Sequence, residues 1–173
     1  MNLLGSHWVK KERRLEPEEI LNRAALDLHV MEHSKKVMEV ALRFTSDLDT
    51  EDKRLVHDGA LLHDVGRGIT HSLSHGLEGA QYLRSLGVEE PLARIVECHV
   101  GAGLTADDYT LQGLPPIDCI PFTLPEKIVA HADNLVKGIR EISFYERFQK
   151  NIALPKRIQR RYFKLYLEME LWL

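Results

Sequence analysis

The chain is poor in cysteine, and this scarcity excludes two classes of small protein. Its 173 residues include only 2 cysteines, Cys98 and Cys119. They lie in different segments and lack the paired spacing of a zinc ribbon, so neither a disulfide framework nor a cysteine-based zinc site is expected. We expect both to be buried or incidental thiols in a reducing compartment, and we predict a cytoplasmic protein.

The sequence also lacks long apolar runs and a basic surplus. No stretch reaches the ~20 apolar residues that a membrane-spanning helix needs, so no membrane partner is expected. The 23 basic and 26 acidic residues give a formal net charge of −3. Nucleic-acid-binding domains usually carry a basic surplus, so we expect no nucleic-acid polymer as a partner. An anionic ligand would have to be held by a local positive group.

Strand-like alternation is missing too, whereas apolar residues recur with helical spacing along the chain. A length of 173 residues is sufficient for one domain with a hydrophobic core. We therefore expect an all-α, single-domain bundle over residues 17–173, with a core at about 20–140 and C-terminal helices at 143–173. Residues 1–16 are expected to form a flexible leader.

Capping residues, prolines and glycines mark where the expected helices begin and end. The predicted helices cover about 17–28, a segment through Val37 to Ser46, 50–66, Ser72 or Ser74 to Gly87, 91–99, 123–138, a segment from 143 and a segment from 155. Gly113 and three prolines interrupt residues 101–122, so we expect an irregular loop there. A long irregular segment at this place is a reasonable substrate lid.

Four histidines and two aspartates stand out as potential metal ligands, because each lies in or beside a segment with helical spacing. They are His33, His63, Asp64, His75, His99 and Asp133. Separate helices of a bundle can point such residues into one central cleft. Nitrogen and carboxylate ligands without a thiolate suit iron, manganese, zinc, cobalt or nickel. The sequence therefore predicts a transition-metal site in the cleft.

A His-Asp pair occurs twice, as His57-Asp58 and as His63-Asp64. At about 100° per residue, positions 57 and 63 project about 240° apart on one helix, so they cannot serve the same site. The second pair lies at the expected helix end, where Gly66 gives the chain room to turn. We therefore assign the second pair to the metal site and His57 to the surface or the surroundings of the site.

The order His, His-Asp, His, His and Asp resembles that of the two-metal HD-domain metal-dependent phosphohydrolases, over about residues 20–140. Residues 125–134 also resemble a small archaeal HD group. The resemblance implies that one metal is held by His33, His63, Asp64 and Asp133, and a second by Asp64, His75 and His99. The implied cofactors are two divalent transition metal ions, iron or manganese first, with zinc, cobalt or nickel as alternatives.

The implied function is metal-dependent phosphohydrolysis, and we expect a phosphodiesterase. Two close metal ions activate a water molecule and clamp the oxygens of a phosphoryl group. The expected substrate is a nucleotide-like or cyclic phosphate small molecule, with a pterin 2′,3′-cyclic phosphate as one candidate. Two alternatives stay open, a two-iron HD-type oxygenase and a non-catalytic ligand-sensing HD protein.

Individual roles follow from the same resemblance. Asp64, as the bridging ligand, and Arg67, three residues later, are expected to be catalytic. Arg67, Lys35 and Asn134 are candidates for substrate binding, Arg67 through a phosphate oxygen. A surface arginine at a helix end and a solvated lysine explain two of them equally well. The C-terminal helix is expected to dock on the bundle or to form a homodimer seam.

Overall fold

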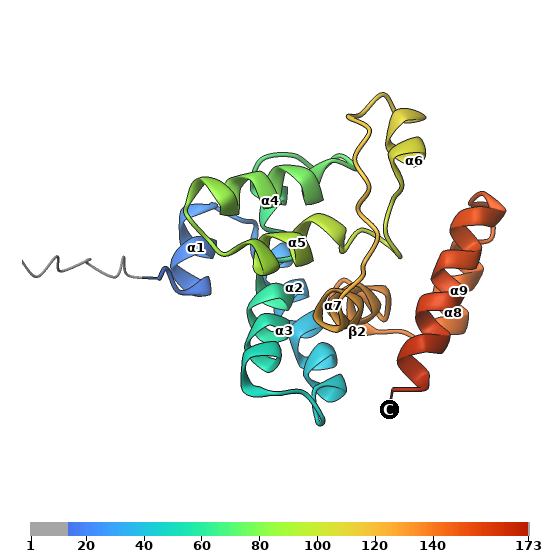
Figure 1. Ribbon diagram of the computed structural model, residues 1–173, viewed down its shortest axis with the longest axis horizontal. Helices are drawn as coiled ribbons and strands as arrows, with labels where there is room; N and C mark the ends of the chain where they lie inside the picture. Colours follow the sequence, from blue (N-terminus) through green and yellow to red (C-terminus); the bar gives the residue numbers. More distant parts are fainter. Residues whose placement is uncertain (1–13, 173) are drawn as a thin grey trace, which may run out of the picture.

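The computed structural model describes residues 14–172 and is built almost entirely from helices (Figure 1). Residues 1–13 of the expected leader lie outside the described residues. The elements in chain order are α1 (Pro17–Arg23), α2 (Leu28–Ala41), η1 (Leu42–Phe44), α3 (Thr50–Leu62), η2 (Val65–Gly68), α4 (His75–Ser85), α5 (Glu90–Cys98), α6 (Ala106–Thr110), α7 (Leu124–Asn134), β1 (Val136–Lys137), β2 (Arg140–Glu141), α8 (Phe144–Lys150) and α9 (Lys156–Glu170). The predicted all-α class is confirmed.

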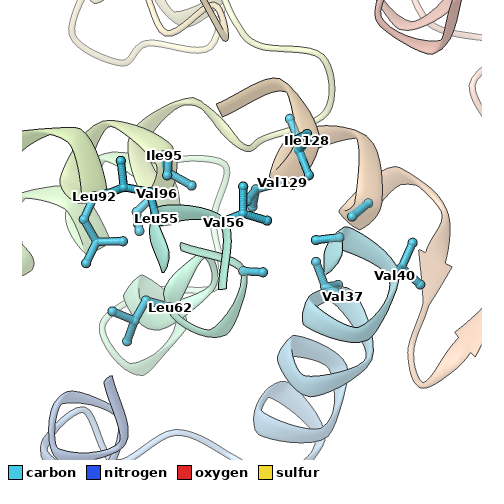
Figure 2. Packing of buried hydrophobic residues seen from close by; sticks show 14 of the residues in the cluster. Val37, Val40, Leu55, Val56, Leu62, Leu92, Ile95, Val96, Ile128 and Val129 are labelled. Atoms are coloured by element: carbon cyan, nitrogen blue, oxygen red, sulfur yellow. The ribbon is translucent and has the colours of Figure 1, made fainter. Parts of the chain in front are cut away.

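Helix α3 lies at the centre of the core and contacts α1, α2, α5 and α7. Figure 2 shows Val56 of α3 between Val37 of α2, Val129 of α7 and the apolar side chains of α5. Val37, Val56 and Val129 are fully buried. Burying such a side chain stabilises the fold by about 1.5–3 kcal/mol relative to leaving it exposed. The core therefore fixes the ends of α2, α3, α5 and α7 relative to one another.

The boundary between the first two helices was predicted wrongly. Helix α1 ends at Arg23, and α2 already begins at Leu28. The connecting turn places Ala25 at φ 49°, a left-handed conformation that residues other than glycine and asparagine rarely adopt. Asp27, the N-cap residue of α2, was the signal in the sequence for this helix start. His33 therefore lies inside α2 rather than at its front.

The end of α7 also differs from the expectation. The helix stops at Asn134 instead of continuing to Gly138, and β1 pairs with β2 in an antiparallel hairpin that we did not expect. Gly138, at φ 60°, is the first residue of the two-residue loop, the position that favours glycine in tight hairpins. This hairpin carries backbone atoms that reach the predicted metal cluster.

The predicted irregular loop over 101–122 is confirmed, with one short helix, α6, inside it. Thr105 and Asp108 form a capping box at the start of α6. The buried Asp108 also accepts hydrogen bonds from Arg157 (2.9 Å) and from Arg161, both on α9. The loop is thereby tied to the C-terminal helix rather than free.

Helix α9 docks on α7 with one face, as the simpler expectation had it (Figure 1). Leu165 and Met169 are buried on that face, whereas Phe163 and Leu167 are exposed on another. A homodimer through this helix stays a prediction. No helix within residues 14–172 is long and apolar enough to span a membrane.

Gly66→Ala is expected to lower the free energy of unfolding of the metal-free protein by about 3 kcal/mol. A Cβ at Gly66 would overlap the carbonyl oxygen of His75 and lie 2.7 Å from the backbone nitrogen of Gly79. Backbone cannot move aside as a side chain can. Urea denaturation measures the loss.

Gly113→Ala is the matched control. Nothing lies within 4 Å of a Cβ at Gly113, although its φ is +71°. Only the backbone strain, about 1 kcal/mol, should be lost. Equal losses in the two variants would contradict the close approach of η2 to α4.

Candidate metal centre

The six predicted ligands come together in one cluster. His33 lies on α2, His63 and Asp64 between α3 and η2, His75 at the first residue of α4, His99 directly after α5, and Asp133 near the end of α7. The exposed fraction of their side chains ranges from 0% for His63 to 22% for Asp133. Five of the six lie at or next to a helix end, where the chain direction changes and a short side chain can reach inward.

The carboxylate of Asp64 lies in the middle of the cluster, and its two oxygens face different histidines. Oδ1 lies 3.1 Å from His75 Nε2 and 3.5 Å from His99 Nε2. Oδ2 lies 3.6 Å from His63 Nε2 and 4.0 Å from His33 Nε2. Asp64 therefore divides the cluster into two halves, an arrangement in which one carboxylate can bridge two cations.

Asp133 completes the half that contains His33 and His63. Its Oδ1 lies 3.0 Å from His33 Nε2 and 3.7 Å from His63 Nε2. Within the cluster, the sets of donor atoms that lie within 4.8 Å of one another are His33, His63 and Asp64; His63, His99 and Asp133; and Asp64, His75 and His99. Each set is compact enough for one ion.

Each histidine of the cluster is held by a hydrogen bond from its Nδ1 to a backbone carbonyl. The acceptors are Gly138 for His33 (2.8 Å), Ala60 for His63 (2.8 Å), Ser72 for His75 (2.8 Å) and Val96 for His99 (2.6 Å). Because a carbonyl oxygen can only accept, each Nδ1 carries the proton. The Nε2 of each neutral ring is then a bare lone pair that faces the cluster, as in histidine metal ligands.

These lone pairs fit a bound cation. His75 Nε2 and His99 Nε2 are only 3.1 Å apart, so two acceptors face each other when both rings are neutral. Among the described side chains, His63 Nε2 is a buried nitrogen without a hydrogen-bond partner. A cation between them converts these repulsive contacts into attractive ones. Nitrogen and carboxylate donors suit a divalent transition metal.

The cluster also shifts its own pKa values. Burial alone would raise the pKa of Asp64, but the neighbouring histidines, His63 first, hold it below its usual range. Burial alone would also raise the pKa of Asp133, but the hydrogen bond with His33 and the nearby histidines lower it to about 2. Burial lowers the pKa of His63 to about 4. At neutral pH the cluster thus holds two carboxylates and a neutral His63. Burial alone would lower the pKa of His33 and of His99, but the hydrogen bonds and charges of Asp133 and Asp64 raise both. A bound cation would have to displace any proton on those two rings.

The other His-Asp pair lies outside the cluster, where the sequence placed it. His57 Nδ1 lies 2.9 Å from Asp58 Oδ1, and the His57 side chain is 41% exposed. Asp58 also pairs with Arg14 and Arg54. The Asp58 carboxylate links Arg54, on the same helix, to Arg14 before α1, so this His-Asp pair has a structural explanation. His29 shares α2 with His33 but is 95% exposed.

The three predicted substrate contacts occupy different surroundings. Arg67 Nε lies 2.8 Å from Asp64 Oδ2, and the Arg67 side chain is 30% exposed, so the guanidinium lies where solvent meets the cluster. Lys35 is exposed on α2. Asn134 is buried, and its Nδ2 donates to the carbonyl of Gly101 (2.7 Å). Asn134 therefore supports the loop after His99, and its contact with substrate stays a prediction.

Two supporting residues were missed by sequence reasoning. The Gly138 carbonyl holds His33 from the unexpected hairpin. Arg147 of α8 donates to the backbone carbonyls of Asp133 (3.2 Å) and Val136 (2.7 Å), which fixes the end of α7. The glycine in a two-residue loop was the available signal for the hairpin, whereas nothing in the sequence marks an arginine that binds carbonyls.

A second group of possible donors, Glu97, Cys98 and Cys119, lies nearby. Both thiols are buried, as predicted. The carboxylate of Glu97 is already bound by Arg84 (2.7 Å) and Arg94 (2.6 Å). Two guanidinium groups at that carboxylate disfavour a further cation, so we assign no metal to this group.

The comparison with protein families agrees with this geometry. The family model described as HD domain matches residues 30–138, the segment that holds all six clustered residues. The chain belongs to the HD-domain family. HD domains bind divalent metals, and this HD domain presents histidine and aspartate groups that can hold them.

Two similar proteins show which lengths of chain this HD domain matches. The uncharacterized protein MJ0778 of Methanocaldococcus jannaschii is 44% identical over 137 residues, which are 75% of this chain and 81% of that protein. A protein of Picrophilus torridus named tRNA (cytidine(56)-2'-O)-methyltransferase is 42% identical over 131 residues, 76% of this chain but only 38% of that protein. Its name describes a different kind of function, and this HD domain matches only part of its length.

The fold is that of a known HD phosphodiesterase domain. The crystal structure of the Listeria monocytogenes phosphodiesterase PgpH HD domain matches with a TM-score of 0.56 and 14% sequence identity, over 84% of this chain and 94% of that one. The same domain in complex with cyclic-di-AMP matches equally well. At this identity the similarity establishes the fold alone.

His131→Phe is expected to make the metal-free protein less sensitive to acid. His131 is buried against the ring of Phe44, and burial lowers its pKa to about 4. Since an unfolded histidine has a pKa of about 6.5, the unfolded state binds the proton first as pH falls. The wild type should lose about 2 kcal/mol more stability than the variant between pH 7 and pH 5.

Urea denaturation at both pH values, with a chelator present, measures this difference. His29→Phe is the matched control, because that side chain is 95% exposed; it should leave the pH dependence unchanged. An identical acid response of the wild type and His131→Phe would show that His131 is not the group responsible.

Proposed function

We propose that this HD domain is a metal-dependent phosphodiesterase that uses two divalent metal ions. The observation that supports the proposal is the carboxylate of Asp64, whose oxygens face His75 and His99 on one side and His63 and His33 on the other. Bound there, two ions supply Lewis acidity at a phosphoryl oxygen and lower the pKa of water. Iron or manganese are the first candidates, with zinc, cobalt and nickel as alternatives.

In the proposed site, some residues of this chain would bind the metal ions and others would orient the ligands. Asp133, His33 and His63 would hold one ion with Asp64, and His75 and His99 would hold the other. The four carbonyl acceptors would keep every Nε2 facing the cluster. Asp64 and Asp133 offset only two of the four positive charges of two dications, so the loaded site attracts a phosphate despite the acidic chain.

Arg67 is placed to bind the phosphoester. Its Nε is 2.8 Å from Asp64 Oδ2, and part of its side chain is exposed. A guanidinium beside the bridging carboxylate can donate to a non-bridging phosphate oxygen. Lys35, exposed on the same helix as His33, adds positive charge at longer range.

The proposed substrate is a small phosphodiester, nucleotide-like or cyclic, and a pterin 2′,3′-cyclic phosphate remains a candidate. The structural match to an HD domain in complex with cyclic-di-AMP supports a nucleotide-like molecule. A second candidate is a phosphodiester of RNA, which one observation favours: the relative from Picrophilus torridus is named for tRNA methylation. The formal net charge of −3 favours the small molecule.

Metal analysis of the loaded protein is expected to give about two equivalents per chain. His75→Ala should reduce the value to about one, because it removes a ligand that only one half of the cluster uses. His71→Ala, four residues earlier at an exposed position, is the matched control and should leave it at two. One equivalent in the wild type, unchanged in His75→Ala, would rule out the two-ion proposal.

Asp64→Asn is expected to abolish hydrolysis of a phosphodiester such as bis(p-nitrophenyl) phosphate. His57→Ala, in the other His-Asp pair, should retain activity within about twofold, because the ring lies away from the cluster. Circular dichroism checks that both variants fold. Equal loss in both variants would show that the wrong pair was assigned.

Turnover in heavy-oxygen water distinguishes hydrolysis from the alternatives. Under anaerobic conditions, mass spectrometry should find one solvent oxygen in the product phosphate. A strict dioxygen requirement would indicate the two-iron oxygenase. Tight binding of phosphoesters without turnover would leave the ligand-sensing protein.

A further inference from the structure

A cavity of about 400 Å³ lies between the loop that follows His99 and the beginning of α9. Most of its lining is apolar, with Asp108, Gln112, Arg157 and Tyr162 as polar residues. The apolar walls include Leu73, Val100, Leu104, Leu111, Leu154 and Ile158. Small-molecule sites of about 300–1,000 Å³ share this character of apolar walls with few polar groups.

Two walls of this cavity are continuous with the backbone that holds the metal cluster. Leu73 follows Ser72, whose carbonyl oxygen accepts the hydrogen bond from His75 Nδ1 (2.8 Å). Gly101 comes two residues after His99 and lines the cavity. The cavity is therefore lined by the two chain segments that lead to His75 and away from His99.

Tyr162 lines the cavity at the segment that follows His99. Its hydroxyl packs so closely on Gly101 that a Cβ there would overlap it. Burial and the charge of Asp133 both raise the pKa of Tyr162, so the phenol lies within the electrostatic reach of that carboxylate. The amide of Asn134 donates to the Gly101 carbonyl (2.7 Å) and keeps this wall in place.

The charged residues that line the cavity are paired with each other, which suits an uncharged organic group. Asp108 is buried and paired with Arg157 (2.9 Å), and also with Arg161, which does not line the cavity. One carboxylate and one guanidinium group leave this end close to neutral. Arg157 is 50% exposed, so part of its guanidinium stays accessible to a ligand.

We propose that this cavity binds the organic group of the substrate, a flat heterocyclic group of single-nucleoside size, while the metal cluster binds the phosphate. The proposal rests on the proposed phosphodiesterase function. The volume of about 400 Å³ accommodates one such group, and the leucine and isoleucine side chains of the lining would remove its apolar surface from water. Simple alkyl phosphodiesters, which leave the cavity empty, should be poorer substrates.

Two substrates that release the same p-nitrophenolate test this inference: the p-nitrophenyl ester of thymidine 5′-monophosphate and methyl p-nitrophenyl phosphate. Leu111→Trp places a larger side chain into the cavity from a position that is 68% exposed. We expect kcat/KM for the thymidine ester to fall about tenfold, mainly through KM, and that for the methyl ester to stay within about twofold. Leu171→Trp, at an 88% exposed leucine away from the cavity, is the matched control and should change neither.

A binding measurement separates failure of the cavity from failure of the function. Calorimetry with thymidine 5′-monophosphate in the presence of a chelator should show binding that Leu111→Trp weakens about tenfold. Hydrolysis of both esters with unchanged discrimination in Leu111→Trp would overturn the cavity and leave the function standing. Binding weakened by Leu111→Trp without hydrolysis of either ester would overturn the function and leave the cavity standing. Neither binding nor hydrolysis would overturn both.

Discussion

Electrostatic repulsion among buried electron donors is the constraint on which the rest of this structure depends. When the rings are neutral, four imidazole lone pairs and two carboxylates face one another, with His75 Nε2 and His99 Nε2 only 3.1 Å apart. Such an arrangement is costly in a low-dielectric interior unless a cation lies among the donors. The hydrogen bonds at every Nδ1 prevent the rings from turning away. The fold thus stores unfavourable interactions that a metal relieves.

The packed helical core holds the six potential ligands at these short distances. Helix α3 packs on α2, α5 and α7 at once, so the ends of these helices meet at one place. Val56 and Val129, both fully buried, lie on the helices that carry His63 and Asp133. The packing that stabilises the core therefore also fixes the distances between the ligand atoms. The close approach of η2 to α4 at Gly66 brings Asp64 to His75 in the same way.

Most of the helices and of the ligand positions were predictable, because capping residues, prolines and glycines mark helix ends in the sequence. Glycines after His63 and His99, and Pro91 near the start of α5, indicate in the sequence that these ligands lie at helix ends. The gathering of six residues followed from a family resemblance, since spacing alone cannot tell which helices meet. The left-handed Ala25, the hairpin after α7 and the carbonyl contacts of Arg147 were missed. Gly138 was a local signal for the hairpin, whereas the conformation of Ala25 and the contacts of Arg147 depend on backbone geometry and tertiary contacts that residue type does not encode.

The hairpin links the metal-binding cluster to the C-terminal part of the chain. His33 is anchored by a carbonyl at the hairpin tip, outside the packed helices, and Arg147 of α8 fastens the strand that leads to it. Ordering of this C-terminal segment and binding of a cation by His33 would therefore be linked equilibria, each favouring the other by the same free energy. A chain with α8 loosened would then hold a cation at His33 less firmly, although every ligand residue is still present.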